Sequence, residues 1–466
     1  MEIYNIAYNL YVQDGEHEPK QMTNFTPVIE TAYYPLESSQ DDIPAYLGIQ
    51  LILEDGSVRS LTLPMTSNLA RTIVAEEPRA VLLKTGYAPL VQKYIVDQLS
   101  KTGRSGECQR GVYLPGNGTY RLADGQHVTV WNGRVAGSTK LEVPYMIKPT
   151  NTYRITNSID RPVPTLVRTL LENDAALVLP VAYALLVSRR DVLTAEQHPL
   201  QGGLYITGVQ SSGKTTLARR VFGYTERIGI PGKAALVLEA VSTEASVRDT
   251  LSENPGCVVI IDDLAHSSSR TIEAHRKKLG GAMLRLAANE GDSTKKGKTG
   301  KTDHRDCTSG IALTAEFVLD GVSELTRSIF VYLEKKLNLT EDVRPALIGA
   351  ILEDFADWFA DNYEHAIELL HKIADSPDIL KNLRVDGADE FTELLTRERR
   401  IQDNLALLQW AFVCMVEMIK STVKLSPHRE QALYEKFWMA VHLSVSKQVD
   451  EFAKIRTHLK KGNIAH

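Results

Sequence analysis

A glycine- and lysine-containing segment with the sequence GVQSSGKTT carries the residue types that bind a nucleotide phosphate. Its glycines let backbone N–H groups curl around an anion, and a helix that begins there adds its partial positive charge. Lys214 is expected to reach the β- and γ-phosphates, and the Thr215 hydroxyl to coordinate Mg²⁺. The segment predicts a site for ATP and Mg²⁺ with these binding residues: Gly208, Val209, Gln210, Ser211, Ser212, Gly213, Lys214, Thr215 and Thr216.

Two consecutive acids, Asp262 and Asp263, follow the apolar run Cys257–Ile261. An ATPase needs a carboxylate at a strand tip to hold the Mg²⁺ shell, which we assign to Asp262. It also needs a base that orients the attacking water, for which Asp263 is the first choice. Glu239 and Glu316 compete for the role of base, because each follows another apolar run and ligands bind at the carboxyl ends of parallel strands. The pattern predicts ATP hydrolysis and leaves the identity of the base open.

Two further polar residues lie at the ends of predicted strands. Thr314 ends the run Ile311–Thr314, where its hydroxyl either bonds the γ-phosphate or the water, or belongs to an ordinary strand residue. Arg327 precedes the run Ser328–Leu333. Phosphoryl transfer builds up negative charge that an arginine of a neighbouring subunit often neutralises. Arg327 is therefore predicted to act in this way, with a surface ion pair as the alternative. Weaker candidates for the same role are Arg285 and Arg305.

The segment from Arg270 to Arg305 is strongly basic. It holds ten basic and four acidic residues, a local charge of +6 in a chain whose net charge is −5. Its central stretch, residues 291–301, is flexible by composition, and a mobile lysine loop suits the phosphate backbone of a nucleic acid better than its bases. A solvated insertion is the alternative. The residues predicted to contact DNA are Lys295, Lys296, Lys298 and Lys301.

The periodicity of apolar residues divides the chain into four parts. Residues 1–150 are predicted to form an N-terminal α+β domain with a hairpin at the Asp55-Gly56 turn. Residues 151–199 are a helical connector, 200–335 the ATPase core, and 336–466 a helical lid and C-terminal helical domain. The core alternates helical patterns with continuous apolar runs, which are typical of parallel strands buried on both faces. The predicted fold class is α/β, a P-loop parallel sheet flanked by helices.

The bulk composition is typical of a soluble globular protein. The 466 residues include 43% hydrophobic and 24% charged side chains. The four cysteines lie far apart without a CxxC pair, which fits a reducing cytoplasm and argues against a zinc site. The N-terminus lacks the pattern of a secretion signal. The longest apolar run, Ala175–Val187, is too short to span a bilayer. A cytoplasmic protein without a membrane partner is expected.

These motifs together resemble the family of domain of unknown function 927, which is similar to AAA+ and superfamily 3 helicase ATPases of mobile genetic elements. The resemblance covers roughly residues 45–335 and is most specific at the GVQSSGKTT segment and the acid pair. It includes a Thr-Gly-Glu-like motif in which this chain has Ala315 instead of glycine. Looser motifs lie at Asp55-Gly56 and between Arg110 and Gly125. The other segments that carry it are Ser242–Ser246, Ile260–Leu264, Leu284–Gly291, Thr314–Glu316 and Arg327.

The resemblance implies an ATPase that assembles as a homo-oligomeric, hexameric ring and moves or remodels single-stranded or forked DNA during replication of a mobile element. Subunits would then share ATP between Lys214 and Asp262 of one chain and Arg327 of the next. A second hypothesis is a nucleotide-gated assembly or defence ATPase without translocation. A third is a degenerate nucleotide binder with little turnover. AAA+ engines drive many processes, so the fold alone does not choose among these hypotheses.

Overall fold

The computed structural model describes residues 1–36, 43–105, 107–149, 153–230, 232–239, 242–266, 268–288, 294–296, 302–304, 307–319, 321–375 and 399–462. The chain forms two compact units. The first comprises Met1–Pro115, Arg121–Gln126 and Lys140–Pro149, and the second comprises Gly116–Tyr120, His127–Thr139 and Thr150–His466. Residues 116–120 and 127–139, which the sequence analysis places in the N-terminal domain, belong to the second unit.

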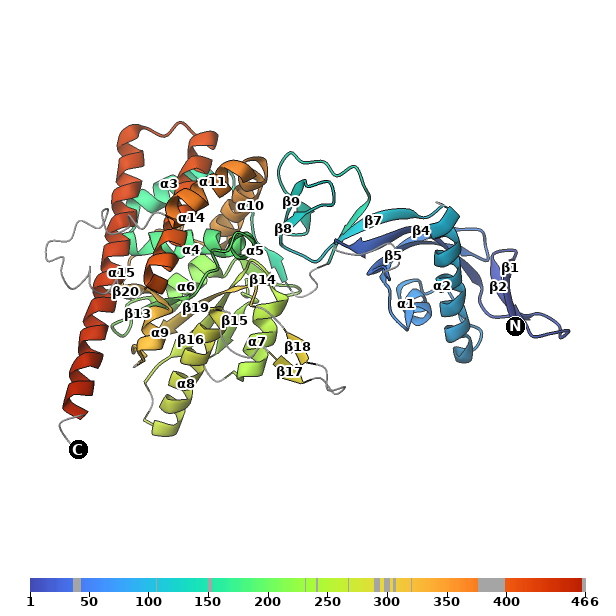
Figure 1. Ribbon diagram of the computed structural model, residues 1–466, viewed down its shortest axis with the longest axis horizontal. Coiled ribbons are helices and arrows are strands. Elements are labelled where there is room, and N and C mark those ends of the chain that lie inside the picture. The colour runs from blue at the N-terminus through green and yellow to red at the C-terminus, as the bar shows by residue number, and fades with distance from the viewer. Residues whose placement is uncertain are drawn as a thin grey trace. The chain divides into compact units, whose positions relative to one another are not determined.

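The first unit is built on a five-stranded sheet in the order β11-β7-β4-β5-β6, of which β4, β5 and β7 are labelled in Figure 1. The predicted hairpin is confirmed, because β5 and β6 pair antiparallel on either side of the turn. Gly56 in that turn has a φ of +78°, which glycine adopts readily. Apolar residues of β4, β5 and β6 and of the helices α1 and α2 form one core. The elements of the sheet and these helices are β4 (Phe25–Pro35), β5 (Tyr46–Leu53), β6 (Val58–Pro64), α1 (Leu69–Glu76), α2 (Ala88–Ser105), β7 (Gln109–Leu114) and β11 (Tyr145–Ile147).

A five-stranded parallel sheet forms the centre of the second unit. Its order is β15-β16-β19-β13-β20, and every neighbouring pair is parallel. The inner strands are buried on both faces, which explains the continuous apolar runs in the sequence. β19 lies between β13 and β16, so the strand before the glycine-lysine segment and the strand with the acid pair are not direct neighbours. The strands are β13 (Gly203–Gly208), β15 (Val237–Glu239), β16 (Val258–Leu264), β19 (Gly310–Ala315) and β20 (Ser328–Leu333).

Helices flank this sheet and continue into a helical C-terminal region, coloured orange to red in Figure 1. α6 and α8 each contact both β16 and β19. Most of the longest apolar run of the sequence, Ala175–Val187, lies in α4, whose residues are all buried. The helices of this unit are α3 (Pro162–Glu172), α4 (Val178–Ser188), α5 (Arg190–Ala195), α6 (Lys214–Phe222), α7 (Glu244–Glu253), α8 (Arg270–Ala287), α9 (Val322–Thr326), α10 (Pro345–Asp361), α11 (Tyr363–Ala374), α14 (Arg399–Thr422) and α15 (Pro427–Gly462).

α14 is the one described helix whose length and composition would allow it to cross a membrane. Such a single helix is weak evidence, since 67% of its most apolar window is buried inside the protein. Its Trp410 indole donates a hydrogen bond of 2.8 Å to the carbonyl of Ala366 on α11. α14 thus serves as a core helix of the second unit, against which α4 and α11 pack.

Candidate functional site

The loop that joins β13 to α6 is held in a conformation that requires glycine at two positions. Gly208 has a φ of +150° and Gly213 a φ of +97°. A Cβ at Gly208 would lie 2.2 Å from the carbonyl oxygen of Leu333 on β20, so a larger residue cannot fit there. The Leu337 N–H donates to the Ser212 carbonyl at 2.9 Å and fastens the loop to the segment after β20. The loop therefore has a defined shape in which backbone N–H groups precede the N-terminus of α6.

Polar groups of the loop turn toward its own interior. The Lys214 ammonium donates to the carbonyls of Gly208 at 3.1 Å and Val209 at 2.8 Å. Burial lowers the pKa of Lys214 below its ordinary value, and the nearby Glu316 carboxylate opposes part of that shift. The Ser212 hydroxyl is buried and has no hydrogen-bond partner among the described residues. Val209 and Gln210 are exposed. The loop thus offers a cation and an unsatisfied hydroxyl to an anion.

Asp262 on β16 is hydrogen-bonded to side chains of α6 and β19. Its Oδ1 atom accepts hydrogen bonds from the hydroxyls of Thr215 at 2.9 Å and Thr314 at 2.6 Å. Its Oδ2 atom accepts from the Arg219 guanidinium of α6 at 3.0 Å. The Asp262 residue is only 6% exposed. Since Thr215 follows Lys214 directly, the carboxylate and the ammonium belong to one site.

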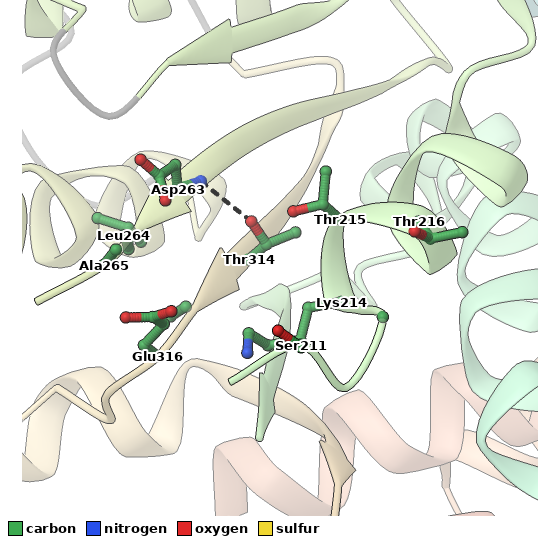
Figure 2. Close-up of a pocket in the computed structure, with 11 residues that line it drawn as sticks. Ser211, Lys214, Thr215, Thr216, Asp263, Leu264, Ala265, Thr314 and Glu316 are labelled. Atoms are coloured by element: carbon green, nitrogen blue, oxygen red, sulfur yellow. Dashed lines mark hydrogen bonds between the residues drawn. The ribbon is translucent and has the colours of Figure 1, made fainter. Parts of the chain in front are cut away.

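A cavity of about 270 Å³ lies between the loop and the carboxyl ends of β16 and β19. Figure 2 shows Lys214, Thr215 and Ser211 on one side of it and Glu316 and Asp263 on the other, with Thr314 between them. Asp262, which is hydrogen-bonded to Thr215 and Thr314, lines a second cavity of about 900 Å³ instead. The lining residues are Ser211, Gly213, Lys214, Thr215, Thr216, Asp263, Leu264, Ala265, Thr314, Ala315 and Glu316.

Two of the three candidate bases line this cavity. Asp263 lies where the β16–β19 register shifts, and its φ of +69° is left-handed, a conformation that aspartate adopts more easily than most residues. Its N–H donates to the Thr314 hydroxyl at 3.1 Å, and its carboxylate lies 3.6 Å from the Arg276 guanidinium of α8. Glu316 follows β19 on the same wall. Glu239 ends β15, pairs in register with Asp262, and lines the larger cavity.

Two arginines of the site were not predicted from the sequence. Arg219 binds Asp262, and Arg276 lies beside Asp263. The sequence could have indicated Arg219, because Thr215 and Arg219 are four residues apart on a predicted helix and therefore lie on the same face. No local pattern relates Arg276 to Asp263, because their proximity depends on how α8 packs against the sheet.

Arg327 lies at the amino ends of the parallel strands, opposite to the cavity at their carboxyl ends. It precedes Ser328, which pairs with Gly203 at the amino end of β13, whereas the loop follows the carboxyl end. The six residues of β13 span roughly 17 Å, so Arg327 cannot serve the cavity of its own chain. Its guanidinium donates to the Ser323 carbonyl at 2.6 Å. The pKa of Arg327 is lowered mainly by its burial. The positive charges of Arg400 and Arg285 lower it further. Any role in phosphoryl transfer therefore requires a second copy of the chain.

The basic segment contains a pair of short strands. β17 (Thr294–Lys296) pairs antiparallel with β18 (Thr302–His304), and Lys295 stands opposite Asp303 in the register. Of the segment 291–301, only residues 294–296 are described, and these form a strand, whereas a loop was predicted. Lys295 and Lys296 belong to β17. The residues that lie outside the described part are Lys298, Lys301 and Arg305.

The fold of this chain is similar to that of a solved structure described as "SCCmec type IV Cch - active helicase". The TM-score is 0.59 at 12% sequence identity, over 96% of this chain and 79% of that chain. No protein-family model matches the sequence, and no similar curated protein is found. At this identity the likeness concerns the fold, a mixed α/β chain with a parallel sheet and a helical C-terminal region.

Proposed function

We propose that the chain is a Mg²⁺-dependent P-loop ATPase that binds the phosphates of ATP between the 208–216 loop and the carboxyl ends of β16 and β19. The observation that carries the proposal is the position of Asp262, which accepts hydrogen bonds from Thr215 and Thr314 beside the cavity that Lys214 lines. A phosphate-binding segment and an acidic strand tip thereby meet at the edge of a parallel sheet where ligands bind.

The chemistry of the residues fits a triphosphate and its metal. Lys214 and the loop N–H groups supply positive charge to phosphate oxygens, and the buried Ser212 hydroxyl is a further donor. Thr215 and Asp262 offer the oxygen ligands that Mg²⁺ takes directly or through water. Bound Mg²⁺ would neutralise charge on the β- and γ-phosphates. Thr314, held by Asp262 and by the Asp263 N–H, would position the terminal phosphate or the attacking water.

We further propose that the ATPase is an AAA+ or superfamily 3 helicase-like motor of the domain of unknown function 927 family, which acts on DNA of a mobile element. Support comes from the sequence motifs and from a fold shared with a protein described as an active helicase of SCCmec. Because Arg327 lies at the amino ends of the strands, the role proposed for it needs a ring in which each cavity is completed by the next subunit. A hexamer is the expected size.

The choice between the two cavity acids can be tested by isosteric substitution. We expect Asp263→Asn to lower the rate of phosphate release by about 10²–10⁴-fold, because removal of the base leaves the attacking water without a proton acceptor. Affinity for Mg-ATP should change by no more than a few fold. Glu316→Gln should have the smaller effect on the rate. The matched control is Glu239→Gln, which lies outside the cavity and should behave as the wild type. A larger loss in Glu316→Gln than in Asp263→Asn would transfer the role of base to Glu316.

The motor function can be tested by adding single-stranded DNA. We expect DNA to raise ATP turnover, and replacement of Lys295, Lys296, Lys298 and Lys301 by alanine to abolish that stimulation while basal turnover persists. Each lost phosphate contact should reduce the slope of log affinity against log salt by roughly 0.7. The control variant replaces four exposed lysines of the first unit, Lys84, Lys93, Lys140 and Lys148.

The same assay decides between the motor and the assembly ATPase. If DNA changes neither turnover nor oligomeric state, and no binding is seen at low salt, the motor proposal is wrong. ATP-dependent oligomerisation under those conditions would favour the nucleotide-gated assembly instead, with the lysine segment contacting no DNA.

A further inference from the structure

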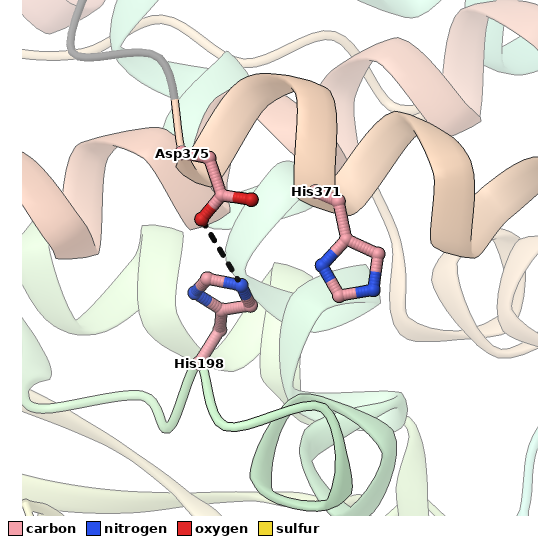
Figure 3. Close-up of side chains that lie close together, drawn as sticks. All are labelled: His198, His371 and Asp375. Carbon is pink, nitrogen blue, oxygen red and sulfur yellow. Dashed lines mark ion pairs between the residues drawn. The ribbon is translucent and has the colours of Figure 1, made fainter.

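We propose that His198, His371 and Asp375 bind a divalent transition-metal ion, for which Zn²⁺ is the best match. The ligand atoms of these side chains all lie within 4.8 Å of one another. Figure 3 shows them facing one another across the gap between α11 and the segment that follows α5. The site lies within the second unit and plays no part in the nucleotide chemistry proposed above, so each proposal can fail without the other.

Two carboxylates already approach the histidine nitrogens. His198 Nε2 lies 3.8 Å from Asp375 Oδ1, and His371 Nε2 lies 3.3 Å from Glu196 Oε2. The two imidazole rings lie side by side, with centroids 5.6 Å apart and ring planes tilted by 60°. Imidazole nitrogens and the carboxylate oxygens of Asp375 and Glu196 therefore converge, and these are the donor atoms that bind a transition-metal ion.

The backbone holds the three ligands in place. His371 and Asp375 are four residues apart at the end of α11, so they share one face of the helix, and the Asp375 N–H donates to the His371 carbonyl at 3.0 Å. The His198 N–H donates to the Leu193 carbonyl of α5 at 2.8 Å. Gln197 before it has a φ of +63°. This turn sends the chain back toward α11 and presents the His198 imidazole to the helix.

The spacing of the donors suits a tetrahedral ion. Zn²⁺ binds histidine nitrogen and carboxylate oxygen at about 2.0–2.2 Å in tetrahedral geometry, which places ligand atoms about 3.3 Å apart. The observed separations of 3.8 Å and at most 4.8 Å exceed this value by an amount that side-chain rotation can close. Glu196 or water would complete the fourth position. Two imidazoles favour Zn²⁺ over Mg²⁺, which prefers oxygen ligands alone.

The cysteine spacing argues against a zinc site, but the candidate ligands here are two histidines far apart in the chain and an aspartate. A metal there would join the end of α11 to the segment that leads into β13. Because such a site is not formed in the unfolded chain, its binding energy adds to folding stability. Zn²⁺ would thus anchor the helical C-terminal region to the segment that enters the parallel sheet.

The test uses the full chain, stripped with a chelator and then dialysed against Zn²⁺ in excess Mg²⁺. We expect one tightly bound equivalent of Zn²⁺ and a higher melting temperature with Zn²⁺ than without it. His371→Ala and Asp375→Asn should each lower the affinity for this Zn²⁺ ion. The loss should exceed the roughly 10- to 100-fold that is typical of losing an outer-shell partner. His365→Ala, which removes an exposed histidine of the same helix, is the matched control and should bind as the wild type.

A second measurement covers the case in which a variant fails to fold. Co²⁺ added to the wild-type chain should give the visible absorption of a tetrahedral ion, and Zn²⁺ should displace it. The proposal is overturned if the wild type and the Asp375→Asn variant bind the same number of Zn²⁺ ions. It is overturned as well if His365→Ala loses metal to the same extent as His371→Ala. It is also overturned if Co²⁺ gives only the weak absorption of an octahedral ion.

Discussion

Replacing Lys214 by alanine is expected to lower the rate of ATP hydrolysis by at least about 10²–10³-fold, which is typical of losing one charged or polar group that stabilises a phosphoryl or oxyanion transition state. Lys214 lines the cavity, and its ammonium donates hydrogen bonds to the carbonyls of Gly208 and Val209. An anion in the loop would exchange those carbonyl contacts for a charge partner. Phosphate release under saturating Mg-ATP measures the effect.

The control for this prediction is Lys93→Ala, which removes an exposed lysine of α2 in the first unit. It should hydrolyse ATP at the wild-type rate. Circular dichroism should show that both variants fold, because Lys214 makes only two carbonyl hydrogen bonds among the described residues. Unchanged phosphate release in a folded Lys214→Ala variant would mean that the activity comes from another site or from a contaminant.

The second large effect is expected at Asp262. Asp262→Asn should lower hydrolysis by about 10²-fold or more and should abolish the gain in ATP affinity that Mg²⁺ confers on the wild type. The carboxylate accepts from Thr215, Thr314 and Arg219, and an amide must turn its donor NH₂ group toward at least one of these partners. The variant thus loses both the charge that the metal needs and the alignment of Thr215. Nucleotide binding titrated with and without Mg²⁺ measures this.

Asp263→Asn provides the contrast for this measurement. Its side chain is 69% exposed on the cavity wall, and among the described residues its carboxylate pairs with Arg276. The variant should therefore lower turnover and leave the Mg²⁺ dependence of ATP affinity intact. If both variants kept the Mg²⁺ dependence, Asp262 would not be the residue that holds the metal.

Much of the sheet was predictable because strands buried on both faces have a simple sequence pattern. The runs before the glycine-lysine segment and before the acid pair are the strands β13 and β16, although β16 continues through Asp262 and Asp263 to Leu264. The Asp55-Gly56 turn was predictable for a local reason, since few residue pairs fit that turn. The roles assigned to these residues stay predictions until nucleotide is bound.

The rest depends on contacts between residues far apart in the chain. Apolar runs carry no information on strand order, so the position of β19 between β13 and β16 was not predictable. The same holds for Arg276 beside Asp263 and for His198 beside His371, which meet only after helices pack. The pairing of β17 with β18 was not predicted, because the high charge and glycine content of this segment hide it.

The account rests on a triphosphate and its metal occupying the cavity between the loop and the acid-bearing strand. A structure of the chain with Mg²⁺ and a non-hydrolysable ATP analogue tests this directly. We expect the terminal phosphates within hydrogen-bonding distance of the Lys214 ammonium, and the metal between them and the hydroxyl of Thr215, with Asp262 in contact with its ligand shell. Density for the nucleotide at any other surface, with this cavity filled by water alone, would contradict the account.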